Sequence, residues 1–232
     1  MITLRRAKER LRTIHGGQET LHSFDADNPF DPAHDGFRSL EGLREEWLAP
    51  GVEFEFRAPR NLEILTYVWK GALILGDPGG RKITLEMGEC HRATARNGTL
   101  HTAWNGSRIE TARIFQALVT PDRSVVQTPG EKKRFSMADR RGVLRLLFSR
   151  DGRDASLRLR QDAGVYSSIL DPGHHLVHEI PPGRGAWLHL VTGRIQLGDQ
   201  VLHAGDGASL VEEPAVSLTA REPSEILLFD LV

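Results

Sequence analysis

Short alternating runs of hydrophobic and polar residues, separated by glycine and proline, make up most of the chain. The segment 52–56 alternates strictly between apolar and polar positions, which is typical of a half-buried strand. Similar short apolar runs recur at 64–68, 72–75, 201–202, 208–211, 216–218 and 226–231. Many short strands with frequent turn signals predict an all-β sandwich or barrel.

Helical patterns are scarce in the sequence. Two stretches favour short helices, at 40–47 and 136–141. In the second stretch, Ser136 is a candidate N-cap, with Asp139 three residues later. The predicted fold class is therefore all-β with a few short helices.

An internal repeat divides the chain into two halves. Segments 68–77 and 190–199 share the pattern apolar-apolar-x-Gly-x-apolar-x-Leu-Gly-Asp, and their central glycines, Gly71 and Gly193, lie 122 positions apart. A second similarity follows in the same order: a glycine before an acidic residue, Gly88 in the first half and Gly205 in the second, 117 positions apart. Two similarities in one order indicate two copies of a β-barrel unit. We expect Gly71 and Gly193 at hairpin turns between paired strands, and the second pair at turns that enter the next strand.

A polar segment between the two repeats predicts the domain boundary. Residues 121–134 contain Pro121, Pro129, Gly130 and two adjacent lysines, a composition typical of a connection. We therefore expect an N-terminal barrel at 1–120, a connector at 121–142 and a C-terminal barrel at 143–232.

Composition and charge exclude several classes of protein. The 232 residues are 39% hydrophobic and 26% charged, which excludes wholesale disorder. The formal net charge of −1 and the shortness of the basic runs argue against a nucleic-acid partner. No apolar run approaches the ~18–20 residues of a membrane helix, and the first residues lack a signal-peptide core. The single cysteine, Cys90, permits no internal disulfide, so we expect a reducing cytoplasm and no membrane partner.

Motifs spread over nearly the whole chain carry a family resemblance. They are the segments 4–10, 22–24, 30–37 and 63–73 in the first half, and 180–193 and 226–230 in the second. In these segments the chain resembles the pirins, a family of two-domain cupin proteins. The resemblance implies a tandem cupin fold, or bicupin, built from two β-barrels of the jelly-roll type. Function is a separate question, because one fold hosts many functions.

The resemblance also implies one metal, usually iron, in the N-terminal barrel. In the family, a His-x-His pair on one strand and a later His-x-Glu supply the ligands and leave positions open for substrate or dioxygen. In this chain, Arg57 and Pro59 stand at the first two histidine positions, His101 remains at the third, and Ala103 replaces the glutamate. Arg57 is a permanent cation and repels a metal ion. We therefore expect a degenerate site with no metal and no cofactor, where the family alone would imply iron or another divalent transition metal.

Four residues are candidates for a pocket in the first barrel: Arg57, Glu63, His101 and Trp104. A guanidinium inside a barrel that excludes water attracts a small anion or carboxylate. Alternatively, Arg57 fills the space of the lost metal and is neutralised by an acid such as Glu63. In that reading, Glu63 is the ion-pair partner of Arg57 or Arg60.

The remaining histidines and the cysteine are expected to be structural. His91 lies beside a turn and is predicted to be solvated, and the cluster at 174–179 indicates exposed turn histidines before a strand. Cys90 and His91 are adjacent, so a strand would point them to opposite faces and exclude a catalytic dyad.

Three functions remain as alternatives, and none assigns a catalytic residue. The first is a pirin-like bicupin without a metal centre that binds a small, anionic molecule or acts as a regulatory module. The second is a metal-dependent dioxygenase of the quercetin 2,3-dioxygenase type, which requires ligands from elsewhere, such as His22 or His34. The third is a protein-interaction role. Whether the chain is an enzyme stays open, although the loss of metal ligands argues against it, and we expect a monomer or a weak dimer.

Overall fold

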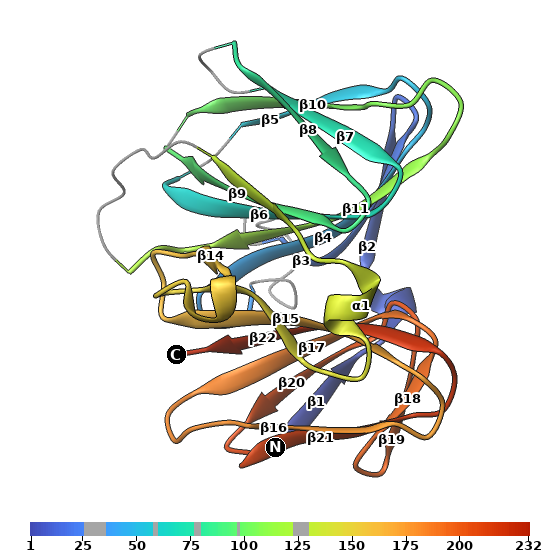
Figure 1. Ribbon diagram of the computed structural model, residues 1–232, viewed down its shortest axis with the longest axis vertical. Helices are drawn as coiled ribbons and strands as arrows, with labels where there is room; N and C mark the ends of the chain where they lie inside the picture. The colour runs from blue at the N-terminus through green and yellow to red at the C-terminus, as the bar shows by residue number, and fades with distance from the viewer. Residues whose placement is uncertain (26–35, 58–59, 77–79, 97, 123–129) are drawn as a thin grey trace. The chain divides into compact units, whose positions relative to one another are not determined.

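The computed structural model describes residues 1–25, 36–57, 60–76, 80–96, 98–122 and 130–232, without the side chains of residues 56 and 57. The chain forms two compact units. We call Leu11–Arg134 the first barrel, and Met1–Arg10 with Phe135–Val232 the second barrel. Each barrel pairs a seven-stranded sheet with a four-stranded sheet in a jelly-roll arrangement (Figure 1). The predicted all-β tandem fold is confirmed.

The first barrel encloses its core between these two sheets. The large sheet has the order β12 (Glu131–Arg134), β9 (Glu89–Ala95), β6 (Leu62–Lys70), β11 (Ala112–Val119), β4 (Leu40–Leu48), β3 (Gln18–Asp25) and β2 (Leu11–His15). The small sheet has the order β5 (Glu53–Arg57), β10 (Leu100–Asn105), β7 (Ala72–Gly76) and β8 (Lys82–Glu86).

The second barrel repeats this topology except at one edge of its large sheet. Its large sheet has the order β1 (Ile2–Arg5), β20 (Gly207–Val211), β17 (Gly185–Thr192), β22 (Ser224–Leu231), β15 (Ala163–Leu170), β13 (Arg145–Ser149) and β14 (Leu157–Arg158). Its small sheet has the order β16 (His175–Glu179), β21 (Ala215–Ala220), β18 (Arg194–Leu197) and β19 (Gln200–His203). At the differing edge of the large sheet, β14 runs parallel to β13, whereas β2 runs antiparallel to β3.

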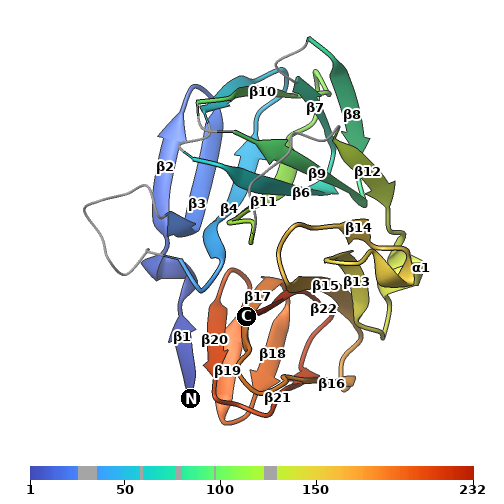
Figure 2. The same ribbon diagram turned by 90° about the vertical axis from the view of Figure 1, so that its left-hand side faces the viewer.

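The two outermost strands are exchanged along the chain. β1 precedes the first barrel in sequence but pairs with β20 of the second barrel over all four of its residues, as both ribbon views show (Figures 1 and 2). β12 precedes the second barrel but pairs with β9 of the first. The units therefore differ from the expected ranges 1–120, 121–142 and 143–232. Long-range strand pairing places β1 in the second barrel and β12 in the first.

The repeat glycines occupy equivalent corners rather than hairpins. Gly71 and Gly193 both have positive φ, +79° and +86°, and each separates a large-sheet strand from a small-sheet strand. The strands on either side are not paired with each other, so the expected hairpins are wrong, although the equivalence of the two positions is confirmed. Gly88 and Gly205, with φ of +81° and +86°, lie at the returns into β9 and β20, as expected.

Among the described residues, the helices are short: η1 (Ala7–Glu9), α1 (Met137–Arg140) and η3 (Arg153–Ala155). Ser136 and Asp139 form the predicted capping box of α1: the Asp139 N–H donates to the Ser136 hydroxyl, and the Asp139 carboxylate accepts from the Ser136 N–H. The helix predicted at 40–47 is wrong, because this segment is β4 in the middle of the large sheet.

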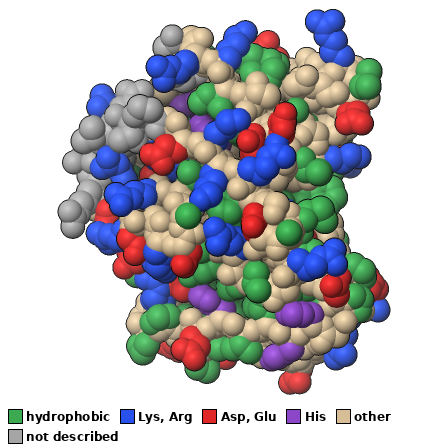
Figure 3. All heavy atoms as spheres, in the orientation of Figure 1, with side chains coloured by type: hydrophobic (Ala, Val, Ile, Leu, Met, Phe, Trp, Pro, Cys, Tyr) green, Lys and Arg blue, Asp and Glu red, His purple; other side chains and the backbone are tan. Residues whose placement is uncertain are grey.

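Acidic and basic side chains alternate on the face of the molecule drawn in Figure 3, with no large area of one sign. This mixture fits the balanced formal charge of −1. None of the helices in the described part of the chain has the length and apolar character needed to span a bilayer.

Candidate functional site

Apolar side chains from both sheets identify the inward face of the first barrel. Leu48, Val68 and Ile114 of the large sheet cluster with Leu73 and Ala103 of the small sheet. Since side chains alternate between the two faces of a strand, every second residue of each strand lies on this inward face.

A row of polar residues crosses that inward face. The register pairs His22 on β3 with Arg44 on β4, and Arg44 with Gln116 on β11. It continues from Gln116 to Thr66 on β6, and from Thr66 to His91 on β9. Four of the five are buried, with exposed fractions of 1% to 8%, and Arg44 is half-buried. We call these five residues the polar row.

A cavity of about 170 Å³ lies at the His22 and Arg44 end of the polar row. We call it the side cavity. Its walls come from β3, β4 and the two edge strands β2 and β5, which border the large and small sheets. The lining residues are Thr13, His15, Gln18, Thr20, His22, Arg44, Glu46, Phe54 and Glu55.

Glu46 is the most deeply buried ionisable group in this cavity wall, with 1% exposure. Its carboxylate accepts a hydrogen bond from Gln18 Nε2 at 3.0 Å. Burial raises the pKa of Glu46, and the charges of Arg44 and His22 and the bond from Gln18 oppose that shift. The raised pKa reflects the cost of holding a carboxylate charge inside a barrel.

His22 connects the polar row to the neighbouring strand and to an acid. Its Nε2 lies 3.2 Å from the Thr13 hydroxyl, and its Nδ1 lies 3.2 Å from Asp25 Oδ2. The contact with Thr13 has hydrogen-bond distance, whereas the geometry at Nδ1 does not meet that of a hydrogen bond. His34, the other histidine considered as a remote ligand, lies outside the described residues.

Two members of the polar row, Gln116 in its middle and His91 at its far end, have buried polar atoms without a hydrogen-bond partner in the described part of the chain. Among the described residues, the two ring nitrogens of His91 and the Oε1 atom of Gln116 form no hydrogen bond. Burial, followed by the charges of Arg92, His101 and Lys132, lowers the pKa of His91 to about 4. The prediction that His91 is solvated is wrong, since its exposed fraction is 4%. An orphaned buried polar atom costs about 1–3 kcal/mol, so this interior favours a molecule that can hydrogen-bond to it.

The small sheet carries the two described family ligand positions. His101 and Ala103 lie on β10 and share the inward face, since Ala103 belongs to the interior cluster. The register places Phe56 opposite His101 and Arg57 opposite Leu100. The side chain of Arg57 and all of Pro59 lie outside the described parts of the chain.

The structure does not bring Glu63 and Trp104 into the interior with His101. Glu63 is fully buried but lies between Leu62 and Ile64, which belong to an interior cluster, so it faces the opposite side of β6. Trp104 alternates with Ala103 and stacks outside, with Lys82 Nζ at 4.7 Å from its ring centre. Arg60 pairs with Glu41 at 3.1 Å.

The residues at the family positions do not fit a metal ion. Of the four positions, only His101 carries a donor side chain, whereas arginine, proline and alanine offer no metal ligand. Within the described ranges, no group of three or more histidine, cysteine, aspartate or glutamate side chains has a geometry that could hold a metal.

The second barrel has an apolar row where the first has its polar row. The equivalent register pairs Leu146 with Tyr166, Tyr166 with Leu228, Leu228 with Leu188, and Leu188 with Ala208. Leu188, Leu228 and Ala208 are fully buried and belong to one hydrophobic cluster. This interior is a packed core.

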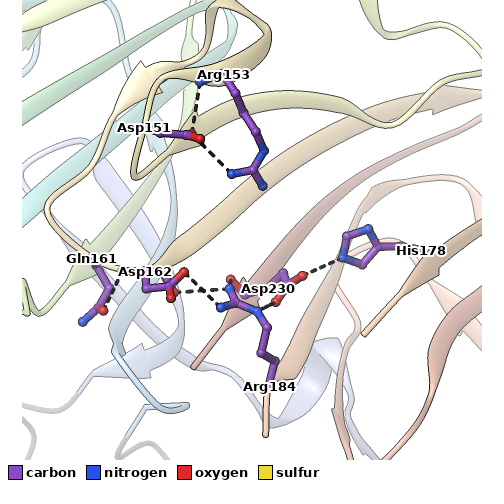
Figure 4. A network of polar contacts seen from close by, with 7 residues as sticks. All are labelled: Asp151, Arg153, Gln161, Asp162, His178, Arg184 and Asp230. Carbon is purple, nitrogen blue, oxygen red and sulfur yellow. Dashed lines mark hydrogen bonds and ion pairs between the residues drawn. The ribbon is translucent and has the colours of Figure 1, made fainter. Parts of the chain in front are cut away.

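A closed ion-pair network lies on the inward face of the second barrel, near one end of its large sheet (Figure 4). Asp230 on β22 accepts from Arg184 Nε at 2.5 Å and contacts His178 Nε2 at 2.8 Å, and Arg184 also pairs with Asp162 at 3.0 Å. Burial alone would raise the pKa of Asp230, but the hydrogen bonds from His178 and Arg184 hold it below its ordinary value. His178 is therefore not the exposed turn histidine that was expected, whereas His175 in the same cluster is exposed.

Sequence reasoning missed Arg44, Glu46 and Gln116, which contribute to the side cavity or the polar row. Arg44 and Glu46 fall in the segment that was interpreted as a helix, where they would lie on different faces. Strand alternation would have placed both on one face with Leu48. The signal was present, but only a correct assignment of β4 makes it visible.

Two family models match the chain. The model described as Pirin matches residues 4–119, and the model described as Quercetinase C-terminal cupin domain matches residues 146–231.

Curated relatives match over the full length. A protein of Escherichia coli (strain K12) named quercetin 2,3-dioxygenase is 32% identical over 231 residues, covering 100% of this chain and 99% of that protein. A pirin-like protein of Caulobacter vibrioides is 29% identical over 217 residues, covering 93% of each. The crystal structure of the bacterial pirin YhhW from Escherichia coli in complex with nickel(II) has a TM-score of 0.89 at 30% identity, covering 100% of this chain and 99% of that chain.

Proposed function

The chain belongs to the pirin family, and on this premise we propose that its first barrel binds a small anionic molecule without a metal centre. In this proposal the protein is a binding or regulatory module built on a bicupin scaffold. The second barrel contributes a packed core.

The contrast between the two interiors carries this proposal. The two barrels share their topology, yet one interior presents His22, Arg44, Gln116, Thr66 and His91 where the other presents mainly leucine and alanine. Stability alone favours the apolar version, because buried polar groups are costly unless they are paired. Polar groups that converge on a cavity fix the orientation of a ligand and give a binding site its specificity.

The donor set at the family ligand positions supports the metal-free part of the proposal. A mononuclear iron site requires about three nitrogen or oxygen donors, and His101 is the single donor at the four positions. Arg57 adds a charge of the wrong sign at a position where the family has a ligand.

A metal-dependent dioxygenase of the quercetin 2,3-dioxygenase type is the second candidate. The name of the 32% identical relative and its full-length coverage favour it. It requires ligands other than those at the family positions.

Metal analysis of protein purified without a histidine tag separates the two candidates. We expect iron, nickel, copper and manganese to be far below one per chain, and no consumption of quercetin. The triple variant Arg57→His, Pro59→His, Ala103→Glu restores the family donor set and is the positive control, which should retain nickel after dialysis. Stoichiometric metal in the unmodified protein, lost in His101→Ala, would contradict the proposal and support the dioxygenase.

A further inference from the structure

The volume of the side cavity suits a small occupant. A cavity of about 150 Å³ in a protein core holds benzene, so the 170 Å³ of the side cavity suits a molecule of a few carbon atoms. A three-ring flavonol is much larger than this space. The ligand of the side cavity is therefore a small metabolite-sized compound.

Two chemically opposite groups lie on the same side of this space. Arg44 and Glu46 are two positions apart on β4, so their side chains project from one face of the strand with Cα atoms about 7 Å apart. Arg44 provides a fork of N–H donors, which can hold a ligand acceptor in addition to contacts within the protein. Glu46 provides acceptor oxygens, and Gln18 uses one of their several lone-pair positions.

The remaining walls suit a short carbon skeleton. Phe54 contributes an aromatic surface from the small sheet, and Thr20 is buried on β3 with 5% exposure. His22 stands beside Arg44 in the register and contacts Thr13 and Asp25. A ligand here meets one cationic fork, one buried acceptor, the ring of Phe54, and the exposed carboxylate Glu55.

We propose that the side cavity binds a short carboxylic acid with a hydrogen-bond donor next to the carboxylate, that is, a small 2-hydroxy or 2-amino acid. The carboxylate lies on the Arg44 guanidinium, and the adjacent hydroxyl or amino group donates to Glu46. This inference rests on the proposed function, since it assumes that the first barrel binds its ligand without a metal.

Four three-carbon probes of matched size test the two contacts separately. Calorimetric titration of the metal-analysed protein with lactate, alanine, propionate and 1,2-propanediol compares a hydroxy acid, an amino acid, an acid without the donor and a diol without the acid. We expect lactate or alanine to bind most tightly, propionate more weakly and the diol not at all. The preference between lactate and alanine identifies the donor.

Variants connect binding to the two named residues. Arg44→Gln should weaken binding of the preferred acid about 10- to 100-fold, as expected for loss of a charge-assisted hydrogen bond. Glu46→Gln should remove the preference for lactate or alanine over propionate. Arg12→Gln, on the neighbouring strand β2 and paired with Glu19 at 2.7 Å, is the matched surface control and should bind like the parent. If Arg44→Gln fails to fold, Arg44→Lys keeps the charge without the fork and should still weaken binding.

The outcomes separate this inference from the proposed function. Metal-free protein that binds none of the four probes, or that binds propionate and lactate equally, overturns the inference and leaves the proposed function standing. Binding that is unchanged in both Arg44 variants also overturns it. Stoichiometric metal in the same preparation overturns the proposed function itself.

Discussion

The two barrels share the order of their strands apart from the edge strands β2 and β14, and their interiors differ in chemistry. Across the five central strands, the first barrel places a polar row and the second places Leu146, Tyr166, Leu228, Leu188 and Ala208. Glycines in the left-handed region turn the same corners in both, at Gly71 and Gly193. The difference indicates that the jelly roll does not need polar residues along this row, so their presence in one copy favours a role in binding.

Ionic groups are also used differently in the two barrels. In the second barrel, Asp230 is satisfied by Arg184 and His178, and the network is closed. In the first barrel, His91 and Gln116 leave polar atoms unsatisfied within the described residues. A satisfied network stabilises a fold, whereas unsatisfied buried atoms destabilise it unless a molecule binds to them.

The largest expected loss of stability comes from substituting a polar residue of the first barrel at the equivalent position of the second. Leu228→Gln puts an amide at the position equivalent to Gln116, inside a fully apolar cluster. Loss of leucine burial together with an unsatisfied amide should lower the free energy of unfolding by about 4–5 kcal/mol. Urea unfolding followed by circular dichroism measures this change.

The reverse exchange is the control for this prediction. Gln116→Leu removes the orphaned Oε1 from the first barrel, so its effect should be within about 1 kcal/mol of zero or stabilising. If both substitutions destabilise equally, the contrast between the two interiors has no energetic basis.

The next effect tests the closed network of the second barrel. Asp230→Ala removes the common partner of Arg184 and His178 and leaves both groups partly buried. Breaking a buried pair costs about 3–5 kcal/mol, and the partial exposure of Arg184 favours the lower end, about 3 kcal/mol. Thermal unfolding checks this value. A shift no larger than that of Asp151→Ala, an exposed acid paired with Arg153, would contradict it.

A pH series tests the buried histidine of the first barrel. The pKa of His91 is lowered from 6.5 to about 4, so below pH 6.5 the unfolded chain takes up a proton that the native state refuses. The contribution of neutral His91 to the free energy of unfolding is therefore fully present above pH 6.5. It falls by up to about 3 kcal/mol as the pH approaches 4. His91→Gln should remove this part of the pH dependence in urea unfolding. Parallel curves for both proteins between pH 4 and 6.5 would refute the assignment.

The smallest expected difference in stability is between alanine substitutions at the two corner glycines, Gly71 and Gly193. Alanine at either position pays the left-handed backbone cost of about 1–2 kcal/mol. At Gly193 a Cβ would also lie 2.3 Å from the Pro223 carbonyl oxygen, whereas at Gly71 its nearest neighbour is Ala112 Cα at 3.0 Å. Gly193→Ala should therefore be the more destabilising by about 1 kcal/mol, as measured by thermal unfolding, and the opposite order would show that the corners are not equivalent.

Local patterns in the sequence predicted the strand-rich fold, the repeat and the capping box at Ser136. They failed at β4, because apolar residues at 40, 43 and 47 have helical spacing, while both faces of this central strand are buried. Arg44 and Glu46 face the barrel interior, which no local pattern distinguishes from solvent. Glu63 and Trp104 were misplaced for a related reason, since the face on which a strand residue lies depends on strand boundaries and register.

The exchanged edge strands have a consequence for how the chain folds. Ile2 pairs with Leu210, more than 200 positions later, so β1 finds its place only after most of the chain has been synthesised. Such distant pairing slows folding, because the cost of closing a long loop comes before any gain from contact. A nascent first barrel also lacks β12 and exposes the edge of β9. Fragments separated just before β12 would each lack one edge strand, β12 in the first and β1 in the second.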